Sequence, residues 1–123
     1  MRPKVLVCDD EEVLRALIRA TLEGAYEIIE TPSGVDSLER ARAERPDVIV
    51  LDMMMPGKSG LDVLSELRED PALAHTPVLM LSARTQVADR EAAAKAGADR
   101  FLAKPFSPLH LASIVAELAG DGR

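Results

Sequence analysis

Continuous apolar runs, repeated along the chain with helical segments between them, are the feature that most limits how this sequence can fold. Four runs stand out, at residues 4–8 (KVLVC), 47–51 (DVIVL), 77–81 (PVLML) and 100–103 (RFLA). Apolar residues follow one another in these runs without alternation, which is typical of parallel strands covered on both faces. A fifth stretch at 26–31 (YEIIET) mixes charged and apolar residues, as an edge strand does.

Segments with helical signals separate these runs. The first predicted helix carries its apolar face on Val13, Leu14, Leu17, Ile18 and Leu22. The next three are expected at about 33–44, from Ser59 to just before Asp70, and at 85–98, where Gly97 ends the helix. The last begins with Ser107 as N-cap and Pro108 at the first helical position. Its predicted core residues are Leu111, Ile114, Val115 and Leu118.

Strand and helix therefore alternate five times, which predicts an α/β fold. Right-handed crossovers wind such a chain into a doubly wound parallel sheet with helices on both faces, and five strands fit the order 2-1-3-4-5. We expect one domain at 1–119, with 120–123 as a C-terminal tail or the start of a linker.

Composition excludes several classes of protein. The net charge of −6 argues against direct nucleic-acid binding. The chain has no apolar run near the ~20 residues of a membrane span, so we expect a soluble cytoplasmic domain. Cys8 is alone and lies in an apolar run, where a small buried side chain without redox function is expected.

Polar residues follow the predicted strands at the edge where such folds bind ligands. Asp9 and Asp10 follow the first strand, Asp52 ends the third, Ser82 ends the fourth and Lys104 ends the fifth. The carboxylates flank the point where the strand order reverses. The sequence therefore predicts one site that combines acids, a hydroxyl group and an ammonium group.

Close carboxylates repel one another unless a cation joins them, and an oxygen-only site without a Cys/His cluster suits Mg²⁺ rather than zinc. A carboxylate beside Mg²⁺ can attack phosphorus, and this role fits Asp52. Lys104 would neutralise the phosphoryl charge and Ser82 would donate a hydrogen bond to it. Each of these residues is also common at strand ends for structural reasons, and Asp9 or Asp10 could be a helix N-cap.

Four motifs together resemble the receiver domain of bacterial two-component response regulators, the CheY-like family. These motifs are VLVCDDEE (5–12), DMMMPGKSG (52–60), LSA (81–83) and FLAKPF (101–106), and the resemblance covers essentially the whole chain. It implies a flavodoxin-like fold. It also implies a phosphorylation-activated switch in a phosphorelay rather than an enzyme with its own metabolic substrate.

The resemblance also assigns roles at the phosphorylation site. Asp52 matches the phosphoacceptor, which forms an aspartyl phosphate. Asp9 and Asp10 match the acidic pair that holds Mg²⁺, for which Mn²⁺ could substitute, and Asp52 and the backbone carbonyl of Met54 complete the protein ligands. The side chain of Met54 occupies a position that influences how fast the phosphoryl group is lost.

Further positions match the switch machinery of the family. Ser82 matches the switch Ser/Thr, Lys104 the lysine that meets the phosphoryl group, and Phe101 the aromatic residue that swings inward on activation. The bond between Lys104 and Pro105 is expected to be cis. Arg84 occupies a second position that influences phosphate lifetime.

The implied donor is a sensor histidine kinase or a histidine phosphotransfer protein. The implied output is an effector reached through the face formed by helix 85–96, strand 100–103 and the last helix. The chain would act alone or as the N-terminal part of a longer regulator, as a monomer or a phosphorylation-dependent dimer.

Three other functions compete with this one. An aspartyl-phosphate phosphatase or phosphotransferase of the haloacid-dehalogenase type needs a second aspartate where this chain has Met54. A flavodoxin-like cofactor binder needs a phosphate-cradling loop where this chain has DDEE. A receiver-like module that is never phosphorylated would not need Asp52 together with Ser82 and Lys104.

Overall fold

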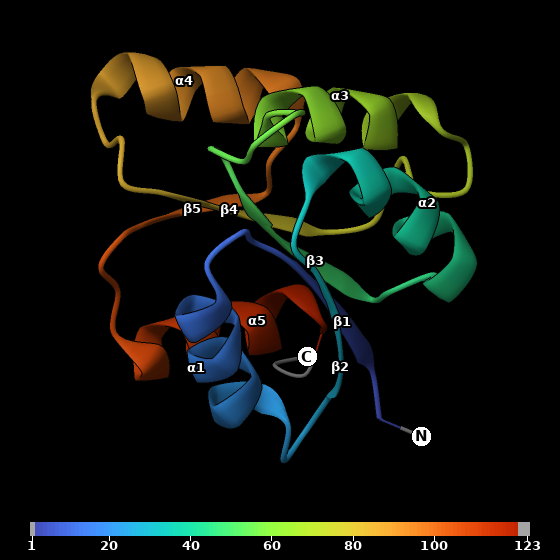
Figure 1. Ribbon diagram of the computed structural model, residues 1–123, viewed down its shortest axis with the longest axis vertical. Helices are drawn as coiled ribbons and strands as arrows, with labels where there is room; N and C mark the ends of the chain where they lie inside the picture. The colour runs from blue at the N-terminus through green and yellow to red at the C-terminus, as the bar shows by residue number, and fades with distance from the viewer. Residues whose placement is uncertain (1, 121–123) are drawn as a thin grey trace.

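The computed structural model describes residues 2–120, and within that range five strands alternate with five helices (Figure 1). The strands are β1 (Lys4–Cys8), β2 (Glu27–Thr31), β3 (Val48–Asp52), β4 (Val78–Ser82) and β5 (Arg100–Ala103). The helices are α1 (Glu12–Leu22), α2 (Gly34–Glu44), α3 (Gly60–Glu69), α4 (Val87–Ala96) and α5 (Pro108–Leu118). The predicted tail lies outside the described residues from 121 onward.

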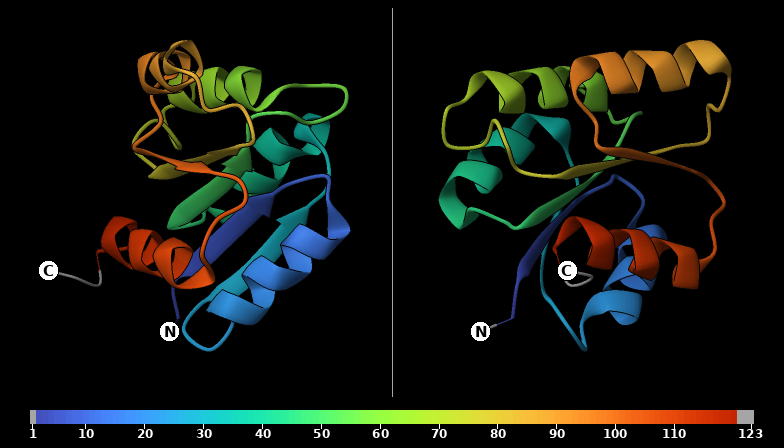
Figure 2. Two further views of the ribbon diagram at one scale, coloured as in Figure 1. Left: turned by 90° about the vertical axis from the view of Figure 1, so that its left-hand side faces the viewer. Right: turned by 180° about the vertical axis from the view of Figure 1, so that it is seen from behind.

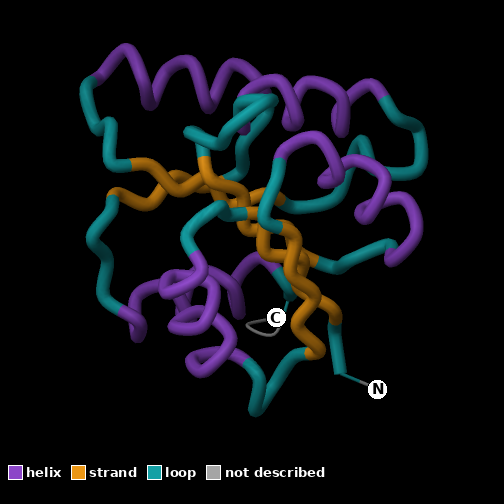
Figure 3. Tube along the Cα trace, in the orientation of Figure 1, coloured by secondary structure: helices purple, strands orange, loops and turns teal. Residues whose placement is uncertain are grey.

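All neighbouring strands pair in parallel in the order β2-β1-β3-β4-β5, as predicted. Figure 3 shows the strands together in the middle of the molecule, with helices on either side. The helices cover both faces of the sheet: α1 and α5 lie on one face, and α2, α3 and α4 on the other (Figures 1 and 2). The strand order reverses between β1 and β3, so the carboxyl ends of these two strands border the crevice where doubly wound folds bind ligands.

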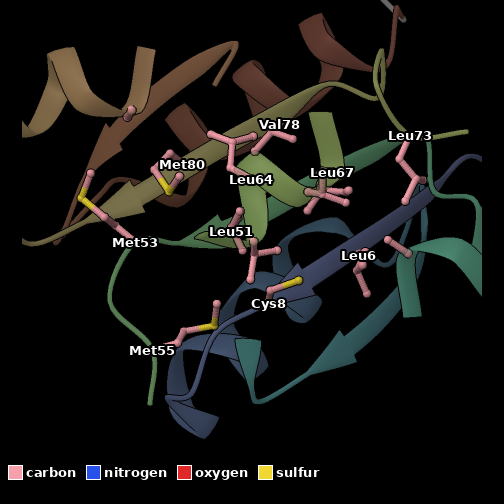
Figure 4. Packing of buried hydrophobic residues seen from close by; sticks show 14 of the residues in the cluster. Leu6, Cys8, Leu51, Met53, Met55, Leu64, Leu67, Leu73, Val78 and Met80 are labelled. Carbon is pink, nitrogen blue, oxygen red and sulfur yellow. The ribbon is translucent and has the colours of Figure 1, made fainter. Parts of the chain in front are cut away.

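Successive strand residues face opposite sides of the sheet, and both sides are buried. In β3, Ile49 and Leu51 pack in the core beneath α2, α3 and α4, whereas Val48 and Val50 pack with α1 and α5. Figure 4 shows the first of these cores, with Leu51 and Cys8 among its labelled residues. Cys8 is buried as predicted, and burial raises its pKa to about 12, so little reactive thiolate forms near neutral pH.

Two residues predicted to lie on the buried face of α1 are exposed instead. Val13 is 84% exposed and Leu17 is 41% exposed, whereas Ile18 and Leu22 are buried. Residues four apart form one stripe of a helix, and the stripe of Leu14, Ile18 and Leu22 faces the core. Val13 and Leu17 lie about 100° around the helix from that stripe, because each residue turns the helix by that angle.

Strand and helix ends differ from the prediction by small amounts. β3 and β4 each begin one residue after the start of their apolar runs, and Asp52 and Ser82 are their last residues, as predicted. The ladder extends to them because Asp52 pairs with Leu81, and Ser82 pairs with Ala103. β5 ends at Ala103, so Lys104 follows the fifth strand and does not end it. Leu118 is only partly buried, since it lies at the last turn of α5.

The predicted caps are present. The side chains of Ser59 and Ser107 accept hydrogen bonds from the backbone N–H groups of Asp62 and His110. Gly97 ends α4 with a φ of 108°, a left-handed conformation that favours glycine. None of the helices in residues 2–120 combines the length and the apolar character needed to cross a membrane.

Candidate functional site

Asp52 lies at the carboxyl end of β3 and is 3% exposed. Its Oδ1 accepts a hydrogen bond from the backbone N–H of Met54 at 3.1 Å, and its Oδ2 accepts one from Lys104 Nζ at 3.1 Å. Each carboxylate oxygen therefore has a donor that fixes its direction. The side chain is therefore oriented at the mouth of the crevice, as a nucleophile requires.

The loop after β3 closes tightly behind Asp52. The backbone N–H of Gly60, the first residue of α3, donates to Met53 O at 2.9 Å. A Cβ atom at residue 60 would lie 2.1 Å from the backbone oxygen of Asp52, closer than atoms can approach. The absence of a side chain at Gly60 therefore lets α3 begin directly against the end of β3.

Asp9 follows β1 and is fully buried. Its Oδ1 accepts a hydrogen bond from the backbone N–H of Glu11 at 2.8 Å. Its Oδ2 lies 3.1 Å from Lys104 Nζ but accepts no hydrogen bond within the described residues. The predicted alternative of a helix N-cap at Asp9 or Asp10 is wrong, because Glu11 holds that position in α1.

Four carboxylates meet at this edge of the sheet. Asp9, Asp10, Glu11 and Asp52 each offer an oxygen, and these oxygens all lie within 4.8 Å of one another. Glu11 was not among the predicted site residues, although its position directly after Asp9 and Asp10 in the run DDEE was a signal for it.

This cluster fits a hard divalent cation. Its donors are all oxygens, which Mg²⁺ prefers. The buried Oδ2 of Asp9 has no hydrogen-bond donor in residues 2–120, and a cation would satisfy it. Asp10 is exposed and can supply a further oxygen from the open side.

Lys104 reaches the same cluster from the end of β5. Its Nζ lies 3.1 Å from Asp9 Oδ2, 3.2 Å from Glu11 Oε1 and 3.1 Å from Asp52 Oδ2. Its side chain is only 13% exposed. The bond between Lys104 and Pro105 is cis, the geometry expected from the resemblance.

Burial and charge act in opposite directions on the acids of the site. Burial raises the pKa of Asp9 and of Asp52 above the usual value for aspartate, although backbone hydrogen bonds and Lys104 oppose this rise. Burial alone would lower the pKa of Lys104, but its hydrogen bond to Asp52 and the charges of Asp9 and Asp52 outweigh that effect and raise the pKa. The site is therefore short of positive charge, and one ammonium group is held firmly in its charged form.

Ser82 ends β4 one residue beyond the partner of Asp52 and is fully buried. Its hydroxyl oxygen accepts a hydrogen bond from the backbone N–H of Arg84 at 2.9 Å. The Arg84 side chain turns toward Asp89 of α4, with Nε 3.4 Å from Oδ1. Within the described residues, the structure does not bring Ser82 or Arg84 into a hydrogen bond or an ion pair with the acidic cluster.

Phe101 lies in β5, away from the cluster. Its ring is partly buried, packs against the core beneath α3 and α4, and has the guanidinium carbon of Arg90 5.2 Å from its centroid. Met54 is 51% exposed, and its backbone N–H binds Asp52.

A doubly wound sheet with paired acids at the switch point, an aspartate on the next strand and a lysine opposite defines the receiver class of signalling domain. The family model of the response regulator receiver domain matches residues 5–116. The chain therefore belongs to the family of response regulator receiver domains, which are signalling switches rather than conventional enzymes.

Individual relatives agree with this assignment. The polar-differentiation response regulator DivK of Brucella anthropi is 33% identical over 122 residues, which cover 98% of this chain and 99% of DivK. The probable transcriptional regulatory protein TcrX of Mycobacterium tuberculosis is 48% identical over 106 residues, which cover 84% of this chain and 44% of TcrX. The chain thus spans about half the length of some curated relatives that it matches.

Solved structures show the same fold. The receiver domain of the sensor histidine kinase PA1611 from Pseudomonas aeruginosa PAO1, solved with a magnesium ion coordinated in the active site cleft, superposes with a TM-score of 0.90. It is 27% identical, and the match covers 98% of this chain and 99% of that one.

Proposed function

We propose that this receiver domain accepts a phosphoryl group on Asp52 from a histidine kinase or a histidine phosphotransfer protein. The observation that carries the proposal is the buried Asp52 carboxylate, held by Lys104 Nζ at 3.1 Å within a cluster of acids that fits a divalent cation. A lysine, a nucleophilic carboxylate and cation ligands together are the parts that phosphoryl transfer needs.

Asp9, Asp10 and Asp52 would hold the cation, with the backbone carbonyl of Met54 as a further ligand. A bound Mg²⁺ would offset the repulsion among these carboxylates and neutralise charge on the phosphoryl oxygens. The related PA1611 receiver domain carries magnesium in its active site cleft, which supports the same assignment here. Mn²⁺ has the same preference for oxygen ligands and should substitute.

In the transfer step, a carboxylate oxygen of Asp52 forms a bond to phosphorus while the bond from phosphorus to the donor breaks. The donor atom, a histidine nitrogen or the oxygen of a small acyl phosphate, keeps the electron pair of the broken bond. Lys104 then donates to a phosphoryl oxygen, and its raised pKa keeps it protonated for this role. The domain thus accelerates its own modification and has no other substrate in this proposal.

The donor protein would dock beside Lys104. A groove there is lined by Lys104 itself, by Leu14 and Leu17 of α1, and by Pro105 and Phe106 after β5. The exposed Val13 extends this apolar surface. A donor histidine must come within bonding distance of Asp52, so an apolar surface bordering the site suits a helix of the kinase or phosphotransfer protein.

The output would follow from charge at Asp52. Phosphorylation adds about −1.5 to −2 charge units, and Ser82 would turn from Arg84 toward the new oxygens. Phe101 would then move inward and change the face formed by α4, β5 and α5. Helix α4 suits such a shift because Ala93 is its only fully buried residue among those described.

We propose residues 1–119 as the receiver domain and 120–123 as its tail or linker. Some relatives are about as long as this chain and others about twice as long, since the match covers 99% of DivK and 44% of TcrX. The domain would act alone, as in the first arrangement, or at the N-terminus of a longer regulator, as in the second.

Labelling with acetyl phosphate and Mg²⁺ tests the acceptor. Asp52→Asn should take up no label and still fold, whereas Asp62→Asn, at an exposed position in α3, should label like the native chain. Equal labelling of Asp52→Asn would refute the assignment.

Thermal unfolding tests the cation site. Mg²⁺ at a hundredfold excess over Kd should stabilise the native chain by about 2.7 kcal/mol. Asp10→Ala should remove this shift. A native chain that shows no shift with millimolar Mg²⁺ would count against the metal site.

A further inference from the structure

Arg15 joins the acidic loop to the neighbouring strand. It lies in the first half of α1, and its side chain is 15% exposed. Its Nη1 donates to the backbone oxygen of Asp9 at 2.7 Å, and its Nε donates to Glu30 Oε1 at 3.2 Å. One guanidinium group thus connects β2 to the residue that begins the cation site.

Glu30 anchors this connection. It is the second-last residue of β2 and pairs with Val7 of β1, so its backbone is fixed by the sheet. Its other oxygen, Oε2, accepts from Arg19 Nε at 2.6 Å. Arg19 also donates to the backbone oxygen of Ile28 at 3.2 Å, so its contacts run to β2 rather than to the acidic loop.

The bond from Arg15 acts directly on the peptide between Asp9 and Asp10. A peptide group is planar, and the group that follows Asp9 contains both the Asp9 oxygen and the N and Cα atoms of Asp10. A donor that fixes the Asp9 oxygen therefore also fixes the orientation of the Asp10 backbone. The N–H of Asp9 donates to Thr31 O at 3.2 Å, and the Asp9 side chain is held by the N–H of Glu11. Arg15 therefore supplies a side-chain restraint on the peptide group between Asp9 and Asp10, in addition to these two backbone donors.

We infer that Arg15 is a positioning residue for the cation site: it holds Asp9 and Asp10 at the spacing that a divalent ion needs. This inference rests on the proposed function of the acidic cluster. Asp9, Asp10, Glu11 and Asp52 repel one another, so a loop without this restraint relaxes by moving its carboxylates apart. Binding a cation must then reverse that movement, which lowers affinity.

Arg19 provides a matched control for Arg15. Both arginines lie on α1 and both pair with Glu30, but Arg15 alone of the two bonds to Asp9. If Arg15 served only to tie α1 to β2, replacing either arginine would have the same effect on cation binding. If Arg15 positions the acidic loop, only its replacement changes that binding.

The test is calorimetric titration of Mg²⁺ into the native chain, Arg15→Ala, Arg15→Lys and Arg19→Ala, each checked by circular dichroism. Partners that orient metal ligands typically contribute 10–100-fold to affinity, so Arg15→Ala should raise the Mg²⁺ Kd by about tenfold or more. Arg19→Ala should stay within about twofold of the native Kd. Arg15→Lys keeps one cationic donor but cannot bind Asp9 and Glu30 at once with the rigid geometry of a guanidinium group. Its Kd should therefore fall between those of the native chain and Arg15→Ala.

Acetyl phosphate labelling gives a second readout. The labelling rate of Arg15→Ala should be low at limiting Mg²⁺ and approach the native rate as Mg²⁺ becomes saturating. An unchanged Kd in Arg15→Ala, or an equal loss in Arg19→Ala, would overturn the inference. If Arg15→Ala does not fold, a native Kd in Arg15→Lys overturns it and a raised Kd supports it. A native chain that binds no Mg²⁺ would instead refute the proposed metal site itself.

Discussion

Lys104 Nζ lies 3.1 Å from Asp52 Oδ2, and the same ammonium group lies 3.1 Å from Asp9 Oδ2. The two aspartates end or follow the strands on either side of the switch point, β3 and β1. A single lysine that follows the edge strand β5 therefore balances two buried carboxylates at the centre of the sheet edge. This relationship links the stability of the domain to the chemistry of its site.

Replacing Lys104 by methionine should destabilise the domain in EDTA. Removing one partner of a buried ion pair leaves an uncompensated charge, and at this partly open site we expect a cost of roughly 2–4 kcal/mol near neutral pH. Urea denaturation measures the loss. The cost should shrink as the pH falls, because Asp9 and Asp52 take up protons and no longer need the ammonium group.

Lys95→Met is the control for this experiment, since Lys95 is exposed on α4. Its effect should stay within about 0.5 kcal/mol. The importance of the Lys104 contacts would be contradicted if the two variants lost the same stability.

Asp52→Asn should stabilise the metal-free domain near neutral pH. Burial raises the pKa of Asp52 above its unfolded value, so the folded state favours the protonated form. The stability gained from that proton is present below the unfolded pKa and is lost as the pH rises through the folded pKa. A neutral amide avoids this loss, so the Tm should rise by a few degrees at neutral pH. The difference from the native chain should disappear in acid. A lower Tm for Asp52→Asn at neutral pH would show that the Lys104 bond outweighs burial.

The sequence predicted the fold because its apolar runs and its helix-capping residues both agreed with the packing. The apolar runs required a sheet covered on both faces, and the serines at 59 and 107 marked helix starts that the structure contains. The candidate site followed from topology, since residues at the carboxyl ends of neighbouring parallel strands must lie close together. Glu11 and Arg15 were not predicted, because their roles depend on side-chain direction.

Tertiary contacts set the direction of a side chain, and the apolar periodicity of the sequence does not predict those contacts. Glu11 turns toward Lys104, and Arg15 turns toward Asp9 and Glu30 rather than toward solvent. Val13 shows the opposite error: its apolar character suggested burial, but its stripe of α1 faces outward. Val13 shares this stripe with Leu17, which lines the proposed docking groove beside Lys104, because residues four apart lie on the same side of a helix.

Arg68→Ala should destabilise the domain more than most arginine substitutions. Its guanidinium donates to Gly97 O at 2.8 Å, to Thr76 O at 2.7 Å and to Asp99 Oδ2 at 3.0 Å. These bonds tie α3 to the end of α4 and to the segments before β4 and β5. We expect a loss of roughly 2–4 kcal/mol in urea denaturation, because partly buried carbonyl groups lose their donor.

Arg42→Ala is the comparison for Arg68→Ala. Arg42 pairs with Asp70 at 2.6 Å, and the side chain of Arg42 is 58% exposed. Exposed ion pairs contribute little, so the loss should stay below about 1 kcal/mol. Equal losses in the two variants would mean that the Arg68 bonds add nothing beyond a surface ion pair.

The aspartyl phosphate should be long-lived, on the scale of minutes or more. Met54 is 51% exposed at the rim of the site, and its thioether cannot orient an attacking water as an amide or carboxylate can. Loss of label after removal of acetyl phosphate measures the lifetime. Met54→Asn should shorten it, and decay of the native phosphate within seconds would contradict the prediction.

Gly60→Ala should damage both stability and phosphorylation. A Cβ at residue 60 would lie 2.1 Å from Asp52 O and 2.8 Å from Met53 Cα, and neither backbone atom can move without moving Asp52. Overpacking of this kind costs roughly 1–3 kcal/mol or more, and the displaced carboxylate should take up label more slowly. Gly24→Ala is the matched control, because a Cβ there meets nothing within 4 Å. It should label at the native rate and change stability by less than about 1 kcal/mol. If Gly60→Ala labels and unfolds like Gly24→Ala, α3 does not need to begin against β3 for Asp52 to be held in place.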